Sequence, residues 1–174
     1  MCRSTDVRHS DFHQGRLPPA RAPRFKRVTC MTVPPGDSST ATLFVIDDDP
    51  HARKAVAALG GSLGLPCQSF ASAEEFLERY TPAMAGCALV DVQLQRMSGL
   101  DLQDWLVEQG SLLPVILISG HADVRMAVRA LKHGALTLLE KPYRADELAD
   151  AIRTGFEVNA RARRAVAKLA NSHG

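Results

Sequence analysis

The sequence predicts an α/β fold in which a five-stranded parallel sheet carries helices on both faces. Two observations predict it: short continuous apolar runs, typical of buried parallel strands, occur five times, and a helix-forming segment follows each of them. Such alternation implies right-handed crossover connections between parallel strands. The 174 residues suffice for one domain of this kind with tails, and they are too few for two full domains.

The first two strands are predicted over residues 42–46 (TLFVI) and 67–70 (CQSF). Pro50 suits the first turn of the helix between them, and Gly64 ends that helix. The apolar stripe of this helix consists of Ala55, Val56, Leu59 and Leu63. After the second strand, Ser72 is expected to cap a helix that begins with the box-like sequence SAEE.

The remaining elements continue the alternation of strand and helix. In order, they are a strand over 87–90 that ends at Asp91, a loop over 92–98, a helix near 99–109, a strand over 114–119, a helix over about 122–133 closed by Gly134, a strand over 135–140 and a last helix that starts near Arg144.

Residues 1–40 differ in composition from the rest of the chain. They contain seven of the 21 Lys and Arg but only three of the 19 Asp and Glu, so the remainder has a net charge of −2. Rich in Arg, His, Pro, Ser and Thr and without periodicity, they are predicted to form a disordered extension. Two explanations stay open: a genuine flexible arm, or a start assigned too early, with translation beginning at Met31. The mildly acidic remainder lacks the basic patch that nucleic-acid binding requires.

The cysteines and the hydropathy indicate the compartment. Cys2, Cys30, Cys67 and Cys87 form no CxxC pair and no zinc-site spacing with histidine. Cys67 and Cys87 begin apolar runs, as small hydrophobic residues do, which favours a reducing environment. No apolar stretch is long enough to span a membrane, and the N-terminus lacks the apolar segment of a secretory signal. We therefore expect a cytoplasmic protein.

Four of the predicted strands end in polar side chains. These residues are Asp47, Asp48 and Asp49 after the first strand, Asp91 after the third, Ser119 at the end of the fourth and Lys141 after the fifth. In open parallel sheets, ligands bind beyond the carboxyl ends of the strands, so we expect these side chains to lie together at one edge.

Their chemistry suits phosphoryl transfer. Several carboxylates at one edge repel one another, and a divalent cation removes that conflict. Magnesium prefers carboxylate, carbonyl and water oxygens, and it keeps water positions that a phosphate oxygen can take. Lys141 adds positive charge for the same phosphate, and Ser119 adds a hydroxyl donor. With a carboxylate nucleophile, these groups predict transfer through an aspartyl phosphate.

Each group taken alone has a simpler explanation. Acids after a strand often cap the next helix, and Asp49, beside Pro50, is predicted to do so rather than to bind a metal. A Lys-Pro pair is commonly a turn, and a serine at a strand end is commonly a cap. The combination of all four strand ends in this order favours the functional interpretation.

Four segments resemble a known family. VIDDDP (45–50), ALVDVQLQRMSGLDLQ (88–103), VILISGHADVRMAVRALKHGA (115–135) and LLEKPY (138–143) are similar to the receiver domain of bacterial response regulators, closest to the FixJ-type subgroup. The resemblance covers about residues 42–155. It implies a flavodoxin-like fold with strand order 2-1-3-4-5.

The resemblance implies a role for each strand-end residue. Asp91 corresponds to the phosphorylated aspartate, Lys141 to the lysine that pairs with the phosphate, and Ser119 to the switch hydroxyl. The implied cofactor is Mg²⁺.

Four groups are expected to bind this metal. Asp48 resembles the acid that binds it directly, and Asp47 the acid that acts largely through metal-bound water. Asp91 itself and the backbone carbonyl of Gln93 complete the implied metal site.

Two positions depart from the family pattern. Gln95 stands where proline usually follows the phosphorylation strand, so the loop over the site is expected to be looser. Leu138 stands where the family has a switch aromatic, which puts the coupling from the site to the surface in doubt. The resemblance further implies a cis Lys141–Pro142 peptide, and Tyr143 is expected to pack at the start of the last helix.

The implied function is that of a response regulator receiver in two-component signal transduction. Its expected partner is a histidine kinase or phosphotransfer protein, and it would be a phosphoacceptor with slow self-dephosphorylation rather than a turnover enzyme. Phosphorylation would shift the face formed by the fourth helix, the fifth strand and the fifth helix. The same face is where a homodimer would form.

The domain boundaries bear on how the phosphorylated protein would pass on its signal. We expect a receiver over 41–156 and a basic helical tail over 157–174. A stand-alone receiver acting through protein–protein contacts, without direct DNA binding, is the first hypothesis. The alternative is a truncated FixJ- or LuxR-type transcriptional regulator that lost its helix-turn-helix domain. A magnesium-dependent phosphatase is a third, disfavoured because such enzymes carry the nucleophile on the first strand rather than the third.

Overall fold

The computed structural model describes residues 40–172. The predicted N-terminal extension therefore lies outside the described residues, apart from Thr40. Among the described residues, no helix is both long enough and apolar enough to cross a membrane.

Within residues 40–172, five strands and five helices alternate, as predicted. Their bounds are β1 Thr42–Ile46, α1 Pro50–Ser62, β2 Cys67–Phe70, α2 Ala73–Arg79, β3 Gly86–Asp91, α3 Gly99–Glu108, β4 Val115–Ser119, α4 Val124–Lys132, β5 Thr137–Glu140 and α5 Ala145–Asn171.

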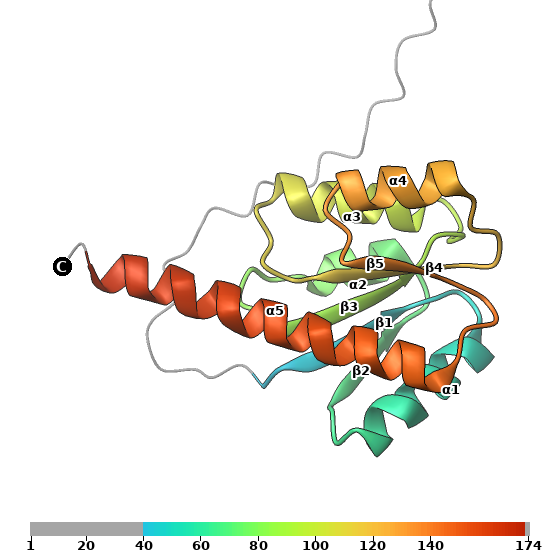
Figure 1. The fold of residues 1–174 in the computed structure, drawn as a ribbon, viewed down its shortest axis with the longest axis horizontal. Coiled ribbons are helices and arrows are strands. Elements are labelled where there is room, and N and C mark those ends of the chain that lie inside the picture. Colours follow the sequence, from blue (N-terminus) through green and yellow to red (C-terminus); the bar gives the residue numbers. More distant parts are fainter. Residues whose placement is uncertain (1–39, 173–174) are drawn as a thin grey trace, which may run out of the picture.

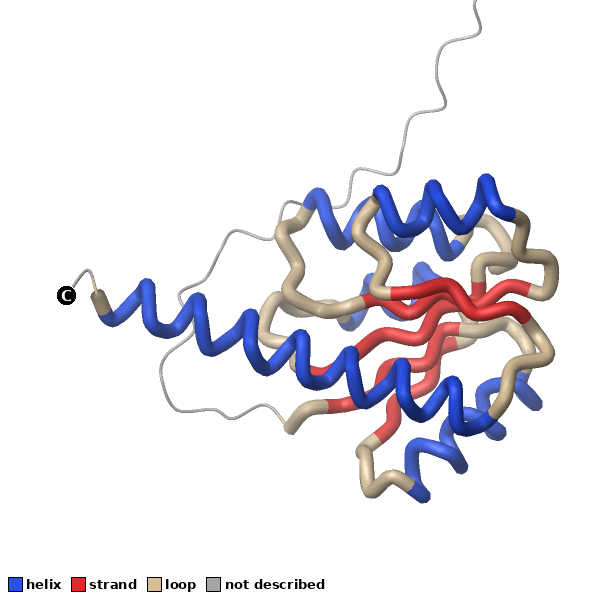
Figure 2. The backbone as a smooth tube through the Cα atoms, viewed as in Figure 1, coloured by secondary structure: helices blue, strands red, loops and turns tan. Residues whose placement is uncertain are grey.

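The strands form one parallel sheet in the order β2-β1-β3-β4-β5, which confirms the predicted order. Helices α1 and α5 cover one face of this sheet, and α2, α3 and α4 cover the other (Figure 1). The tube drawing shows the strands as one twisted layer between the two helical layers (Figure 2). All five strands run in the same direction, so their carboxyl ends lie at one edge.

Alternate residues of the central strands supply the two hydrophobic cores. In β1, Leu43 and Val45 pack in the core beneath α1 and α5, whereas Phe44 and Ile46 pack in the core beneath α2, α3 and α4. This follows from the two-residue period of a strand, which sends successive side chains to opposite faces. Because both faces are covered, these strands are apolar throughout, and this is the pattern that the sequence showed.

The ends of several elements are fixed by side-chain caps. Asp49 caps α1 by accepting the N–H of His51, as predicted. Ser72 caps α2 by accepting the N–H of Glu75, whose own carboxylate accepts from Ala71 rather than from Ser72. The box-like sequence therefore closes one residue earlier than a standard capping box.

Two predicted boundaries in the second half of the chain are wrong by about two residues. The fourth helix begins at Val124 rather than near 122, because Asp123 accepts the N–H of Met126 and caps the helix there. The fifth strand begins at Thr137 rather than 135, because the Ala135 N–H still bonds the carbonyl of Ala130 in α4.

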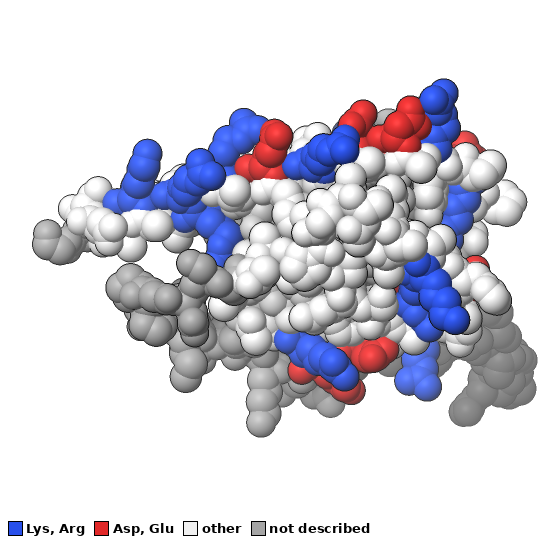
Figure 3. Space-filling view, turned by 90° about the horizontal axis from the view of Figure 1, so that it is seen from below, with Lys and Arg blue, Asp and Glu red and all other residues white. Residues whose placement is uncertain are grey.

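Helix α5 projects past the sheet at its C-terminal end (Figure 1). It runs without a break through the predicted boundary between residues 156 and 157. Asn159 is buried at this level and ties α5 to the sheet by accepting from the Gly86 N–H and donating to the Leu112 carbonyl. Beyond it, Lys and Arg side chains gather on the projecting end (Figure 3): Arg161, Arg163, Arg164 and Lys168.

Candidate functional site

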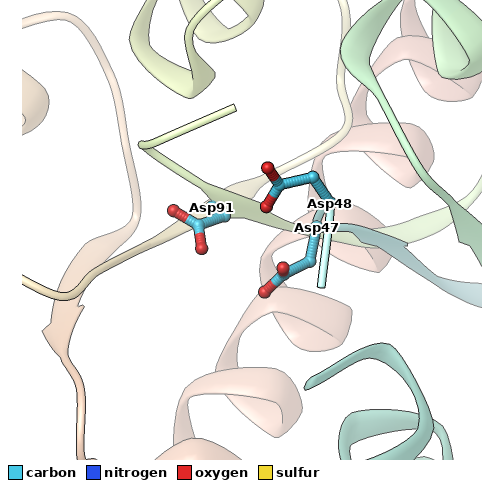
Figure 4. Close-up of side chains that lie close together, drawn as sticks. All are labelled: Asp47, Asp48 and Asp91. Carbon is cyan, nitrogen blue, oxygen red and sulfur yellow. The ribbon is translucent and has the colours of Figure 1, made fainter. Parts of the chain in front are cut away.

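Three carboxylates meet at the carboxyl edge of the sheet. Asp47 and Asp48 directly follow β1, and Asp91 is the last residue of β3, the neighbouring strand. One carboxylate oxygen from each lies within 4.8 Å of those of the other two. Figure 4 shows the three side chains together, and Asp47 and Asp91 are the more buried of them. The predicted convergence of strand ends therefore occurs.

Lys141 completes the cluster from the fifth strand. Its Nζ lies 2.6 Å from Asp91 Oδ2 and 3.1 Å from Asp47 Oδ2. Burial lowers the pKa of this ammonium, but the hydrogen bonds and charges of Asp91 and Asp47 outweigh it, so the pKa of Lys141 is raised. The lysine therefore stays charged at neutral pH and balances part of the negative charge.

The predicted cis peptide precedes Pro142. The backbone also fixes where Lys141 stands, because its N–H bonds the carbonyl of Ser119 at 2.8 Å. This bond joins the ends of β4 and β5.

Asp47 occupies the most constrained place in the cluster. Burial raises the pKa of its carboxyl group, and this effect exceeds the opposing hydrogen bonds from the Asp49 N–H and from Lys141. Its backbone carbonyl accepts from Arg53 Nη1 of α1 at 2.6 Å. A buried carboxylate with this raised pKa gains from any additional positive charge placed beside it.

Asp91 is held from both sides. One carboxylate oxygen accepts from Lys141, and the other accepts the backbone N–H of Gln93 at 2.7 Å. The residue is only 7% exposed, yet it lies at the open edge of the sheet. This arrangement orients the carboxylate and leaves it next to the other two acids.

Ser119 ends β4 and is fully buried. Its hydroxyl oxygen accepts the N–H of His121 at 3.1 Å, and its carbonyl accepts from Lys141. Ser119 is thus tied to the cluster through the backbone of Lys141, while its side chain binds the loop that leads to α4. Gln93 is tied to the cluster through the N–H that Asp91 accepts.

The two residues behind the site pack on opposite faces of the sheet. Leu138 packs against the core beneath α2, α3 and α4, and Tyr143 packs against the core beneath α1 and α5. Tyr143 is half-buried before the first turn of α5, as expected, and burial raises its pKa. Leucine thus fills the space under α4 without a polar group.

Three contributing residues were missed by sequence reasoning. Arg53 binds the Asp47 carbonyl, and Glu74 accepts the Met97 N–H in the loop after Asp91. Ser98 forms a full capping box with Asp101 and starts α3. The Ser98-to-Asp101 spacing carried a readable signal, whereas the partners of Arg53 and Glu74 depend on tertiary packing.

The acids fit the demands of a hard divalent cation. Three carboxylates and one ammonium leave a net negative charge in a partly buried space, and carboxylate oxygens are the ligands that magnesium prefers. Among the described residues, Asp47, Asp48 and Asp91 form the only cluster of this type. The cluster therefore combines a carboxylate, a cation-binding environment and a lysine.

Comparison with known proteins agrees with this geometry. The profile of the response regulator receiver domain family matches residues 43–153. The response regulator protein TmoT of Ectopseudomonas mendocina is 41% identical over 118 residues, which cover 68% of this chain and 54% of TmoT. The chain spans about half the length of the curated relatives it matches.

Solved structures show the same fold. The response regulator StyR superposes with a TM-score of 0.73 at 36% identity, covering 76% of this chain and 67% of StyR. FixJ-N superposes with a TM-score of 0.62 at 34% identity, covering 67% of this chain and 94% of FixJ-N. These similarities agree with the FixJ-type resemblance of the motifs.

Proposed function

The chain belongs to the response regulator receiver family, and on that basis we propose that Asp91 accepts a phosphoryl group from the phosphohistidine of a partner protein. The observation that carries this proposal is the position of the Asp91 carboxylate, 2.6 Å from the Lys141 ammonium and within 4.8 Å of the carboxylates of Asp47 and Asp48. Receiver domains of this family are signalling phosphoacceptors. Asp91 is the acid of the cluster that belongs to the central strand β3.

The proposed transfer forms one bond and breaks one. A carboxylate oxygen of Asp91 attacks phosphorus, the phosphorus–nitrogen bond of the phosphohistidine breaks, and the imidazole leaves with the electron pair. Lys141 then exchanges its contact with Asp91 Oδ2 for the phosphoryl oxygens, which carry more negative charge. The preformed bond from the Gln93 N–H keeps the other carboxylate oxygen in place.

We further propose that Asp47, Asp48, Asp91 and the backbone carbonyl of Gln93 hold Mg²⁺. A bound magnesium ion would neutralise the carboxylates and the incoming phosphoryl oxygens. The raised pKa of Asp47 supports this assignment, because the buried carboxylate lacks sufficient positive charge from Lys141 alone. Asp48 is the most accessible of the three acids and is suited to direct coordination.

The signal is proposed to leave through the face formed by α4, β5 and α5. Ser119 would turn its hydroxyl from the His121 N–H toward the phosphoryl group, and this would alter the β4–α4 connection. Helix α4 buries only Ala130 and exposes an apolar row of Val124, Val128 and Leu131. Such a row on a loosely packed helix suits a partner-binding surface, including that of a second copy.

Mass spectrometry tests the proposal directly. The protein is incubated with acetyl phosphate and Mg²⁺, then reduced with borohydride, which converts an aspartyl phosphate to homoserine. We expect the change at Asp91 and at none of the neighbouring acids. Modification at Asp47 or Asp48 instead would overturn the assignment of the acceptor.

A second candidate function concerns how the phosphorylated receiver passes on its signal. The matched segment covers only 54% of TmoT and 52% of TodT, so these relatives extend well beyond the receiver, which favours a receiver that works with a further domain, such as a helix-turn-helix reader. We propose that residues 41–156 form the receiver and that 157–174 form a basic helical tail, with output through protein contacts and no DNA binding by this segment.

Two measurements separate these outputs. Size-exclusion chromatography with and without beryllofluoride shows whether activation produces a dimer, and the DNA that follows the coding region shows whether a reader domain is encoded. A beryllofluoride-dependent shift to dimer is expected if α4 responds despite Leu138.

A further inference from the structure

The loop over residues 92–98 leads from Asp91 to α3 and is fixed at both of its ends. At the start, the Gln93 N–H bonds Asp91 Oδ1 at 2.7 Å. At the end, the Gly99 N–H bonds the Val92 carbonyl at 3.1 Å. The middle of the loop is less regular, since Arg96 adopts a left-handed conformation with φ 63°.

Glu74 reaches this loop from a different part of the molecule. It lies in the first turn of α2, and its Oε1 accepts the Met97 N–H at 3.3 Å. This bond spans 23 residues of sequence and connects the loop to the helical layer on its side of the sheet. Glu74 therefore restrains the loop from outside, in addition to the bonds the loop makes with itself.

The second carboxylate oxygen of Glu74 indicates that stability alone does not explain this residue. Oε2 is shielded from solvent and has no hydrogen-bond partner among the described residues. A shielded carboxylate oxygen without a donor lowers the stability of the folded state. A favourable interaction with the dipole of α2 would not require burial, because an exposed acid in the same turn provides it equally well.

The residue at position 95 suggests why the loop needs the bond between Glu74 and the Met97 N–H. Gln95 stands where the family resemblance places proline, and proline would restrict both its own backbone and that of the preceding residue. Without that ring, the segment that carries the Gln93 carbonyl has more freedom. A hydrogen bond at Met97 supplies from outside the restraint that the ring would supply from within.

We propose that Glu74 is a positioning residue for phosphorylation: its bond to the Met97 N–H holds the loop so that the Gln93 carbonyl faces the metal-binding acids. The inference rests on the proposed function of Asp91. Glu74 itself touches neither the phosphoryl group nor the metal. Its effect is expected on the Mg²⁺ dependence of phosphorylation rather than on the stability of the fold.

The test compares Glu74→Met with Glu78→Met, an exposed acid on the same helix. Phosphate incorporation from acetyl phosphate is followed over a range of Mg²⁺ concentrations, and thermal unfolding is measured without Mg²⁺. Glu74→Met is expected to raise the Mg²⁺ concentration for half-maximal rate about fivefold, as expected for one hydrogen bond. Its unfolding temperature should stay close to that of the parent, because removal of the unpaired oxygen offsets loss of the bond to the Met97 N–H. Glu78→Met should change neither quantity.

Two rescue variants exclude a merely structural role. Glu74→Gln keeps a carbonyl acceptor for the Met97 N–H and is expected to retain the parent Mg²⁺ dependence. Gln95→Pro, added to Glu74→Met, is expected to restore it by stiffening the loop from within. If Glu74→Met leaves the Mg²⁺ dependence unchanged, or if it lowers the unfolding temperature and neither rescue works, the inference is wrong.

The same assay separates this inference from the proposed function. The parent protein and Asp91→Asn are run alongside the Glu74 variants. Absence of labelling in the parent would contradict the proposed function itself. Normal labelling of the parent with an unchanged Glu74→Met profile would contradict only the role of Glu74.

Discussion

The Nζ atom of Lys141 lies 2.6 Å from Oδ2 of Asp91, although the two residues are fifty positions apart in the chain. The contact exists because β3 and β5 flank β4 in one parallel sheet and all three strands end at the same edge. Asp47, on the other side of β3, shares the same ammonium at 3.1 Å. Lys141 therefore holds two buried carboxylates together before any phosphate arrives.

Replacing Lys141 with methionine tests this role. Without the ammonium, Asp47 and Asp91 repel each other, so the metal-free protein should unfold at a lower temperature and gain more from added Mg²⁺ than the parent does. The phosphorylation rate should fall on the order of a hundredfold, because a donor to the transferred group is lost. Lys132→Met, at an exposed position on α4, is the control and should behave like the parent.

The second prediction concerns the metal site. If Asp48 coordinates Mg²⁺, the parent should be stabilised by about 2.7 kcal/mol at a concentration one hundred times the dissociation constant. Asp48→Asn should lose this stabilisation, measured as the Mg²⁺-dependent shift in unfolding temperature.

The adjacent residue provides the control for this experiment. Asp49 caps α1 through the His51 N–H, and asparagine is an equally good cap, so Asp49→Asn should keep the shift. If Mg²⁺ raises the unfolding temperature of both variants equally, Asp48 does not coordinate the metal.

Gly99 supports the site through close packing against the backbone. A Cβ atom at this position would overlap the carbonyl oxygen of Asp91 and crowd the Cα of Val92. Gly99→Ala should therefore displace the acceptor strand, lower the unfolding temperature and slow phosphorylation. Gly61→Ala, which places a Cβ in open space on α1, should instead stabilise the protein by about 0.5–1 kcal/mol. If Gly99→Ala is phosphorylated at the parent rate, close packing at Gly99 is not needed to position Asp91.

The buried thiol of Cys87 predicts a pH dependence of stability. Burial raises the pKa of this thiol from 9.0 to about 12. The folded state therefore holds the proton more tightly than the unfolded state, so the contribution to stability is complete below pH 9 and is lost as the pH rises from 9.0 toward 12. By pH about 10.5 the loss from this group should reach roughly 2 kcal/mol.

Urea unfolding at several alkaline pH values measures this loss. Cys87→Ala removes the titrating group, so its free energy of unfolding should fall less steeply than that of the parent between pH 9 and about 10.5. Parallel curves for the two proteins would mean that the thiol does not contribute.

Much of the fold and of the site could be predicted from the sequence because the central strands are buried on both faces. Continuous apolar runs such as 42–46 can be recognised without knowledge of their neighbours, and parallel topology then forces their ends together. For that reason the convergence of Asp47, Asp48, Asp91 and Lys141 was predicted, and the order of the strands followed from the family resemblance.

The remainder depended on contacts between distant segments. Nothing local to Glu74 indicates that it reaches Met97, and nothing local to Arg53 indicates that it binds the Asp47 carbonyl. The start of α4 was predicted too early, although Asp123 gives a local cap signal: its carboxylate accepts the N–H of Met126, three residues on. The partners of Glu74 and Arg53, in contrast, are set by packing rather than by local propensity.

Labelling of Asp91→Asn with acetyl phosphate and Mg²⁺ decides whether Asp91 is the phosphoryl acceptor. Asparagine preserves the shape of the side chain and removes the nucleophilic carboxylate. The parent should incorporate one phosphoryl group and Asp91→Asn should incorporate none, while an exposed control, Asp146→Asn, labels like the parent. Undiminished labelling of Asp91→Asn would show that the phosphoryl group goes to another residue.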